Sequence, residues 1–108
     1  MEKNKIKQFL SKNIPIINGW LSIPNSFLAE LMANEDWDSL TLDIQHGLID
    51  YSSSIPMVQA ISTTSKPVLA RVPWNEPGII MKMLDLGVSG IICPMINSKE
   101  DCQKFVSY

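Results

Sequence analysis

An aspartate, a histidine and an arginine lie within or at the end of two apolar segments of this 108-residue sequence. Asp43 belongs to the segment "SLTLDIQHG", which ends on the chain's only histidine, His46, and Arg71 belongs to "PVLARVP". A carboxylate beside a histidine fixes its tautomer and raises its basicity. A guanidinium can bind a carboxylate or stabilise a developing oxyanion. The three residue types therefore indicate an acid–base site.

Structural roles remain open for the same residues. A single histidine after a strand is often a surface residue, and Asp43 with Arg71 could form a purely structural ion pair. Trp20 is more often a core residue than a substrate contact, and Asp85 is by default a solvated or capping acid. The sequence holds neither a second histidine nor a Glu-x-x-His pattern, so it predicts no complete metal site.

Strand-like and helix-like segments alternate along the chain. Residues 14–23, 39–46, 67–73 and 90–96 are apolar and rich in β-branched residues, which predicts four strands. Each is followed by apolar residues at helical spacing, and residues 1–13 predict a further helix at the start. Strands that alternate with helices pair in parallel, because each helix supplies the crossover connection.

The predicted helices have recognisable ends. Asn25 or Ser26 is the expected cap of the second helix, and one of residues 52–54 that of the third. Pro77 is expected to open the fourth helix and Gly87 to end it. Four apolar residues of the second helix are expected on its inward face: Phe27, Leu28, Leu31 and Met32.

Two architectures fit four parallel strand–helix units: half of a (β/α)₈ barrel, or a small open doubly wound sheet. In both, functional groups gather where the strands end, so Asp43, His46 and Arg71 are expected to converge if they line one barrel interior. Nucleotide-binding motifs of the GxGxxG or GxxxxGK[ST] type are absent from the sequence. Because a complete barrel needs about 250 residues, the pattern predicts a truncated product.

Composition excludes several classes of partner. The net charge is −2 and no basic cluster is present, so a nucleic-acid partner is not expected. The apolar runs are far shorter than the ~20 residues of a membrane span, and the N-terminus lacks the apolar region of a signal peptide. We therefore expect a cytoplasmic protein without membrane partners, in which Cys93 and Cys102 are free, buried thiols.

Three motifs together resemble one enzyme family. They are "D-x-Q-H-G" at 43–47, "R-V-P-W-N-E-P" at 71–77 and "L-D-x-G-x-x-G-I-I-C-P-M" at 84–95. The resemblance, which covers nearly the whole chain, is to the HpcH/HpaI aldolases. These class II pyruvate aldolases include 4-hydroxy-2-oxoheptanedioate (2,4-dihydroxyhept-2-ene-1,7-dioate) and sugar-acid aldolases. The resemblance implies the N-terminal half of a (β/α)₈ TIM barrel. Residues 1–108 would then be a partial domain, with an N-terminal helix (1–13) and four strand–helix units (14–108).

The resemblance also implies roles for individual residues. It makes His46 the catalytic base and Arg71 the group that stabilises the enolate and carbonyl oxygens. It places the acid that raises the basicity of the histidine on Asp85. Strand parity, the alternation of side chains between the two faces of a strand, favours Asp43 instead, and both stay candidates. Trp20 matches an aromatic residue that lines the substrate pocket.

Gln45 stands where the family is often acidic. This substitution resembles the branch that acts on sugar acids, so the preferred aldehyde is left open, and so is the choice between aromatic and sugar-acid catabolism.

The implied reaction is reversible cleavage of a 4-hydroxy-2-oxo acid to pyruvate and an aldehyde. The resemblance implies a divalent metal, Mg²⁺, Mn²⁺ or Co²⁺, whose ligands lie on later strands, beyond Tyr108, so no metal ligand is expected in this chain. The isolated chain is then expected to be inactive. The alternatives are a non-enzymatic gene fragment, a half-barrel that self-associates into a homo-oligomer through its open sheet edges, and a small open-sheet binding module.

Overall fold

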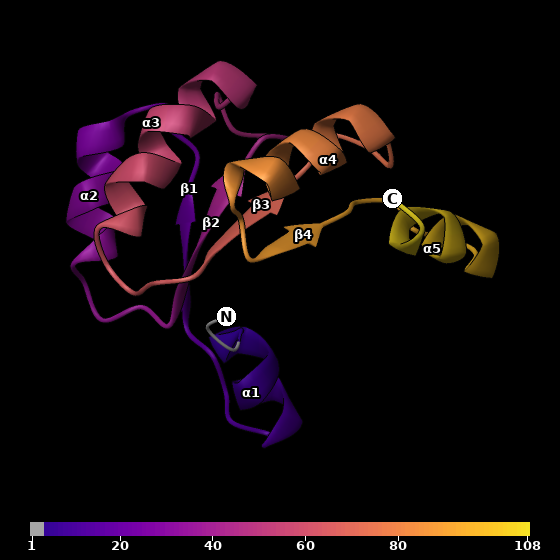
Figure 1. Cartoon of the computed structure of the whole chain (residues 1–108), viewed down its shortest axis with the longest axis horizontal. Helices are drawn as coiled ribbons and strands as arrows, with labels where there is room; N and C mark the ends of the chain where they lie inside the picture. Colours follow the sequence, from indigo (N-terminus) through magenta and orange to yellow (C-terminus); the bar gives the residue numbers. More distant parts are fainter. Residues whose placement is uncertain (1–3) are drawn as a thin grey trace.

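Four short strands pair side by side in the order in which they occur in the sequence. In the computed structural model, which describes residues 4–108, they are β1 (Asn18–Leu21), β2 (Ser39–Asp43), β3 (Val68–Arg71) and β4 (Gly90–Ile92). All three pairings are parallel, as the alternating pattern predicts. Each strand is shorter than its predicted segment, because the flanking apolar residues belong to the connecting loops (Figure 1).

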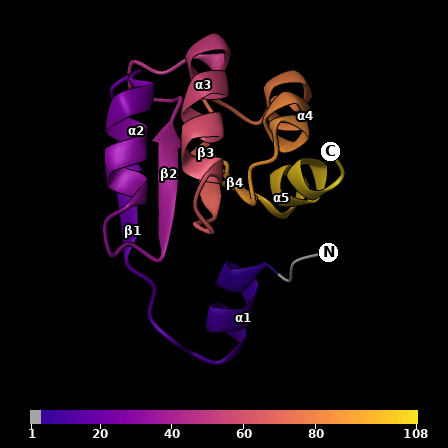
Figure 2. The same ribbon diagram turned by 60° about the vertical axis from the view of Figure 1, so that its left-hand side comes forward.

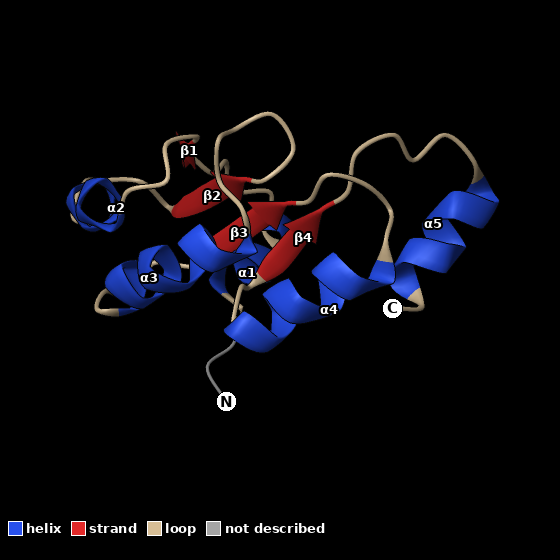
Figure 3. Cartoon of the chain, turned by 90° about the horizontal axis from the view of Figure 1, so that it is seen from above, coloured by secondary structure: helices blue, strands red, loops and turns tan. Residues whose placement is uncertain are grey.

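Within residues 4–108, five helices alternate with the strands: α1 (Lys5–Ser11), α2 (Ser26–Ala33), α3 (Tyr51–Ser62), α4 (Pro77–Leu86) and α5 (Lys99–Val106). The predicted helix at 1–13 is confirmed in its described part, and residues 1–3 lie outside the described residues. Figure 2 shows α1 at the end of the sheet where the strands begin. Seen from above in Figure 3, α2, α3 and α4 lie along one face of the sheet.

The arrangement of these helices distinguishes the two predicted architectures. A doubly wound sheet carries helices on both faces, whereas a barrel carries them all on its outside. Here the three helices that connect consecutive strands cover the same face (Figure 3). The opposite face therefore corresponds to the inside of a barrel wall. Within residues 4–108, β1 and β4 each have one edge without a neighbouring strand.

Helix caps fix the positions at which the connecting loops end. Asn25 caps α2 by accepting a hydrogen bond from the backbone N–H of Leu28, as one of the two sequence candidates predicts. The expected cap of α3 within 52–54 is wrong. Asp50 is the cap, because its carboxylate accepts from the N–H of Ser53 while the Ser53 hydroxyl accepts from the N–H of Asp50.

The fourth helix has the ends that the sequence predicts. Glu76 accepts hydrogen bonds from the N–H groups of the first turn of α4, and Pro77 occupies the first helical position. Gly87 ends the helix with φ +101°, a left-handed conformation that glycine adopts without a steric penalty.

The core lies between the sheet and the three covering helices. The helix-facing side chains of the two central strands, Leu40, Leu42, Val68 and Ala70, are buried. The predicted inward face of α2 is wrong for Phe27 and Leu31, which are 66% and 51% exposed. Ala29 and Ala33 occupy the centre of that face, because small side chains let the helix approach the sheet closely.

The thiols differ from the sequence expectation in their burial. Both are free, but only Cys93 is half-buried, and burial raises the pKa of its thiol. Cys102 is exposed, because α5 lies beyond β4 and has no buried residue among those described (Figure 1). No described helix is long and apolar enough to cross a membrane.

Candidate active site

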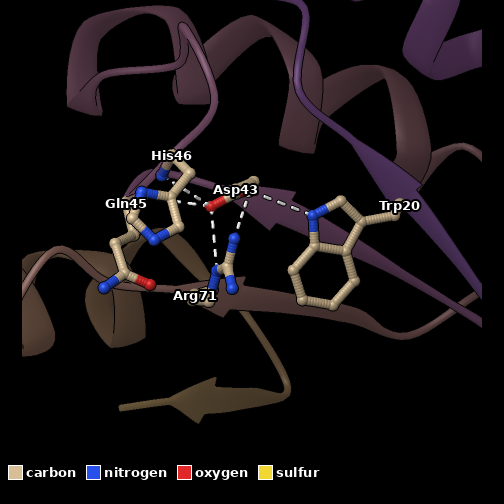
Figure 4. Close-up of polar contacts among 5 residues, drawn as sticks. All are labelled: Trp20, Asp43, Gln45, His46 and Arg71. Carbon is tan, nitrogen blue, oxygen red and sulfur yellow. Dashed lines mark hydrogen bonds and ion pairs between the residues drawn. The ribbon is translucent and has the colours of Figure 1, made fainter. Parts of the chain in front are cut away.

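An ion pair joins the ends of the two central strands. Asp43 and Arg71 are Cα partners in the β2–β3 ladder, so their side chains project from the same, inner face of the sheet. Nε of Arg71 donates to Oδ1 of Asp43 at 3.0 Å, and Nη2 donates to Oδ2 at 2.6 Å (Figure 4). The aspartate side chain is only 4% exposed and the arginine side chain 25%. The ion pair that the sequence left open as a structural role for Asp43 and Arg71 is therefore formed.

The indole of Trp20 completes this cluster from the neighbouring strand. Its Nε1–H donates to Oδ2 of Asp43 at 3.1 Å. Its ring lies against the Arg71 guanidinium, with 4.9 Å between Cζ and the ring centroid (Figure 4). Trp20 is thus neither a core residue nor a simple wall of the site. No sequence pattern predicts its hydrogen bond, because that bond depends on the side-chain conformation.

The same carboxylate also holds the loop that carries the histidine. The backbone N–H groups of Gln45 and His46 both donate to Oδ1 of Asp43 at 3.1 Å. This is the local turn that aspartate favours, because its short side chain can accept from N–H groups two and three residues ahead. Asp43 therefore links three structural units: β1 through Trp20, β3 through Arg71, and its own following loop.

Five N–H donors converge on the Asp43 carboxylate. An ionised carboxylate offers about four lone-pair sites, so its capacity is filled. The Arg71 guanidinium, aided by Trp20 and the two backbone N–H groups, holds the pKa of Asp43 well below its usual range, although burial opposes this. Asp43 is therefore an anchor that is ionised at neutral pH. It has no free oxygen with which to orient the His46 imidazole, the role that strand parity suggested.

His46 is placed at the mouth, the end of the sheet where the strands end, and its side chain is exposed. Among the described residues, no hydrogen bond to its ring is present; its contact with Asp43 is through the backbone. The structure therefore brings His46 into the same cluster as Asp43 and Arg71 but leaves both ring nitrogens free. Such a histidine can exchange a proton with a molecule that enters the mouth.

Asp85 lies away from this cluster. It is exposed in the last turn of α4, which leads into the start of β4, whereas His46 follows the end of β2. The two residues are thus at opposite ends of the sheet, and Asp85 makes no contact with the His46 ring within this chain. The geometric reason is that a helix between parallel strands must run back to the end where the next strand begins.

A polar layer that the sequence reasoning missed lies below the ion pair. The side-chain amide of Asn18 is hydrogen-bonded to the hydroxyls of Ser39 and Thr41, at 2.7–3.1 Å. Both hydroxyl residues are buried. Strand alternation was the available signal, because Asn18 is two residues before Trp20, and Thr41 is two residues before Asp43. The inner face is therefore polar over two successive layers.

Arg71 retains hydrogen-bonding capacity toward the mouth. Its pairing with Asp43 uses Nε and Nη2, the side edge of the guanidinium. The two N–H groups of Nη1 make no hydrogen bond with any described residue. A guanidinium has five N–H donors, so one edge can hold the aspartate while the other receives a carboxylate or an oxyanion. Residues 4–108 contain no group of three or more His, Cys, Asp or Glu side chains that could hold a metal ion.

The fold and the site together define a class of protein. A parallel sheet with all its connecting helices on one face is one wall of a TIM barrel, and its charged cluster lies at the end of the strands, where barrels of this fold carry their functional groups. Comparison with known families agrees, because the model of the HpcH/HpaI aldolase/citrate lyase family matches residues 17–108. The chain belongs to this family.

Individual relatives support the assignment. The chain is 36% identical over 104 residues to a hydroxypyruvate/pyruvate aldolase from Rhizorhabdus wittichii, covering 96% of this chain and 41% of that protein. It is 30% identical over 105 residues to a 4-hydroxy-2-oxo-heptane-1,7-dioate aldolase from Salmonella dublin, covering 97% and 40%. The chain therefore spans less than half the length of these relatives.

A solved structure of the same family superposes on this chain. The crystal structure of an HpcH/HpaI aldolase/citrate lyase family protein from Burkholderia cenocepacia superposes with a TM-score of 0.90 at 28% identity. The match covers 96% of this chain and 42% of that one. The predicted fold, part of a TIM barrel, is thereby confirmed.

Proposed function

We propose that this chain supplies the first four strand–helix units of an aldolase that cleaves a 4-hydroxy-2-oxo acid to pyruvate and an aldehyde. The observation that carries the proposal is the arrangement of Arg71 and His46. The arginine is held by one edge against Asp43, and its Nη1 makes no hydrogen bond with the described residues. The histidine, tied through its backbone to the same carboxylate, has a free imidazole. An oxyanion-binding cation next to a free base is what aldol cleavage needs.

The proposed chemistry follows from these two side chains. His46 accepts the proton of the substrate's C4 hydroxyl, and the C3–C4 bond breaks to leave the aldehyde carbonyl. The electron pair of that bond forms the enolate of pyruvate, whose C2 oxygen receives hydrogen bonds from Arg71. Proton return to C3 then gives pyruvate. Asp43 takes no proton in this scheme, because its pKa is held far below neutral pH.

The remaining components belong to the proposal as well. HpcH/HpaI aldolases generally depend on a divalent metal, but the described residues do not fit one, so no step is assigned to a metal here. We propose that Mg²⁺, Mn²⁺ or Co²⁺ is held by residues outside this chain, and that residues 1–108 form a partial aldolase domain that acts on a 2-oxo acid in the cytoplasm. Alone, the chain is then expected to release no pyruvate.

A chimera tests this function. Residues 17–108 would replace the matching segment of the Rhizorhabdus wittichii relative, which is 36% identical. We expect pyruvate release from 4-hydroxy-2-oxo acids that requires added divalent metal, measured with a coupled lactate dehydrogenase assay. Arg71→Lys should lower kcat by about 10²-fold, since a lysine lacks the second edge that binds the oxyanion.

The controls separate chemistry from folding. Lys82→Arg, on the outer side of α4, should leave kcat of the chimera unchanged, because Lys82 only lies against the ring of Tyr51. Circular dichroism would establish that each chimera is folded. A folded chimera that stays inactive with every metal and substrate tested, or one in which Arg71→Lys and His46→Ala keep full activity, would contradict the proposed function.

A second candidate, a self-associating half-barrel, is favoured by the two sheet edges of β1 and β4 that have no neighbouring strand among the described residues. Exposed strand edges pair readily with other strands. If the 108-residue chain is stable through self-association, we expect sedimentation velocity to show a homo-oligomer at micromolar concentration. A folded monomer under those conditions would remove this candidate, whatever the outcome for the chimera.

A further inference from the structure

We propose that Trp20 is a positioning residue: it holds the Arg71–Asp43 pair in one geometry, so that the free edge of the arginine faces the mouth. The inference rests on the proposed function, because it concerns the arginine to which that function assigns the oxyanion. It differs from the pocket-lining role that the family resemblance implies for this tryptophan. In that role the indole would touch the substrate, whereas here it acts through its neighbours.

The indole contacts both members of the ion pair at once. Its Nε1–H donates to Oδ2 of Asp43, the oxygen that also accepts from Nη2 of Arg71. Its ring face lies 4.9 Å from Cζ of the same guanidinium. The hydrogen bond restricts the carboxylate, and the ring covers one face of the guanidinium plane. Rotation of either charged group would break a contact with the tryptophan.

Arg71 needs such restriction because the ion pair is only partly enclosed. Its side chain is 25% exposed, and an arginine has enough rotamers to keep a carboxylate contact in several poses. Ion pairs in contact with water gain little from their charges alone. A stacked ring and a shared acceptor oxygen select one pose, and that pose leaves Nη1 unbonded.

A second tryptophan at the mouth provides the contrast. Trp74, in the loop after β3, is 58% exposed, and its side chain has no hydrogen bond or ring contact with the described residues. Trp20 is 43% exposed but makes both kinds of contact. Both are partly exposed tryptophans at the mouth, so a variant of Trp74 serves as the control for the contacts that Trp20 makes.

The test uses the 108-residue chain and follows the Arg71 side chain directly. The Nε–H resonance of Arg71 is observed by ¹H–¹⁵N NMR in the parent chain, Trp20→Phe, Trp20→Leu and the control Trp74→Phe. Phenylalanine keeps a ring over the guanidinium but cannot donate to Asp43, and leucine does neither. We expect hydrogen exchange of this N–H to be about tenfold faster in Trp20→Leu, intermediate in Trp20→Phe and unchanged in Trp74→Phe.

An acid titration supplies a second measurement that a mere packing role would not change. The Trp20 hydrogen bond lowers the pKa of Asp43, so Trp20→Phe should raise the pH at which its carboxyl ¹³C resonance titrates. Equal exchange rates and equal titrations in folded Trp20→Phe and parent chains would overturn the proposal. A Trp20→Leu variant that loses the Arg71 signal while Trp74→Phe keeps it would support it.

The result is separable from the proposed activity. Pyruvate added to the parent chain at millimolar concentration should shift the Arg71 Nε–H resonance if the free edge binds a 2-oxo acid. Absence of that shift would count against the proposed function only. The dependence of Arg71 exchange on Trp20 needs no substrate, so the positioning role would stand or fall on the variants.

Discussion

Asp43→Ala is expected to destabilise the fold by about 3 kcal/mol and to release both Arg71 and the loop that carries His46. The substitution leaves five N–H donors without their acceptor, two of them on a charged guanidinium. Breaking a buried ion pair by removing one partner costs roughly 3–5 kcal/mol. The lower end applies here, because Arg71 is 25% exposed and can turn to water.

Asp43→Asn separates charge from shape. The amide keeps the side-chain volume and one acceptor oxygen, so a smaller loss of stability is expected than for alanine. Urea unfolding followed by far-ultraviolet circular dichroism gives both values. Asp36→Ala serves as the control, because Asp36 is exposed and its side chain makes no hydrogen bond or ion pair with the described residues. An Asp43→Ala chain as stable as Asp36→Ala would show that the cluster does not anchor the site.

The same carboxylate predicts how stability changes with pH. Its pKa is lower in the folded chain than the unfolded value of about 3.9, mainly because of Arg71. Ionisation of Asp43 therefore stabilises the folded state relative to the unfolded state. This contribution is fully present above the unfolded pKa and is lost as the pH falls below it. In Asp43→Asn that part of the acid sensitivity should disappear, which unfolding curves at pH 7 and pH 3 would reveal.

Gly47→Ala is expected to displace the His46 loop and to cost about 2–3 kcal/mol. A β-carbon at position 47 would lie 2.3 Å from the carbonyl oxygen of Asp43 and 3.1 Å from Cα of Ser22. Both are backbone atoms, which cannot move aside as a side chain would. The loop is also held by a hydrogen bond from the N–H of Leu48 to the carbonyl of Ser22, so relief of the clash requires breaking it.

Gly78→Ala is the matched control for this prediction. A β-carbon there meets no backbone atom and approaches only the end of the Glu76 side chain, at 3.0 Å, so the capping carboxylate needs to shift by only a few tenths of an ångström. Position 78 is helical, where alanine is intrinsically favoured over glycine. We expect near-neutral stability for Gly78→Ala and unshifted His46 resonances, in contrast to Gly47→Ala. Equal unfolding midpoints for both variants would show that the His46 loop tolerates a side chain at 47.

Local patterns predicted most of the fold because they depend on short-range physics. The alternation of Leu40 and Leu42 with polar residues is typical of a strand with two distinct faces, as β2 has, and Gly87 marked the end of α4 as predicted. The predicted cap of α3, one of residues 52–54, was wrong. Asp50 and the serines after it are all good caps, and the sequence pattern does not rank them. The prediction that Phe27 is buried was wrong, because the helical spacing of apolar residues does not say which side of the helix packs on the sheet.

The sequence by itself indicated the family, the parallel pairing of the strands, and the meeting of Asp43, His46 and Arg71 at one end of the sheet. The family follows from the resemblance of three motifs, whereas the parallel pairing and the meeting of these residues follow from residue periodicity and from the rule that parallel strands end at the same edge. Only the tertiary structure decided what each residue does there. Side-chain conformations made Asp43 a saturated acceptor, placed the Trp20 indole on Arg71, and left the His46 ring free. Asp85 is distant, because the direction of α4 carries it to the other end of the sheet.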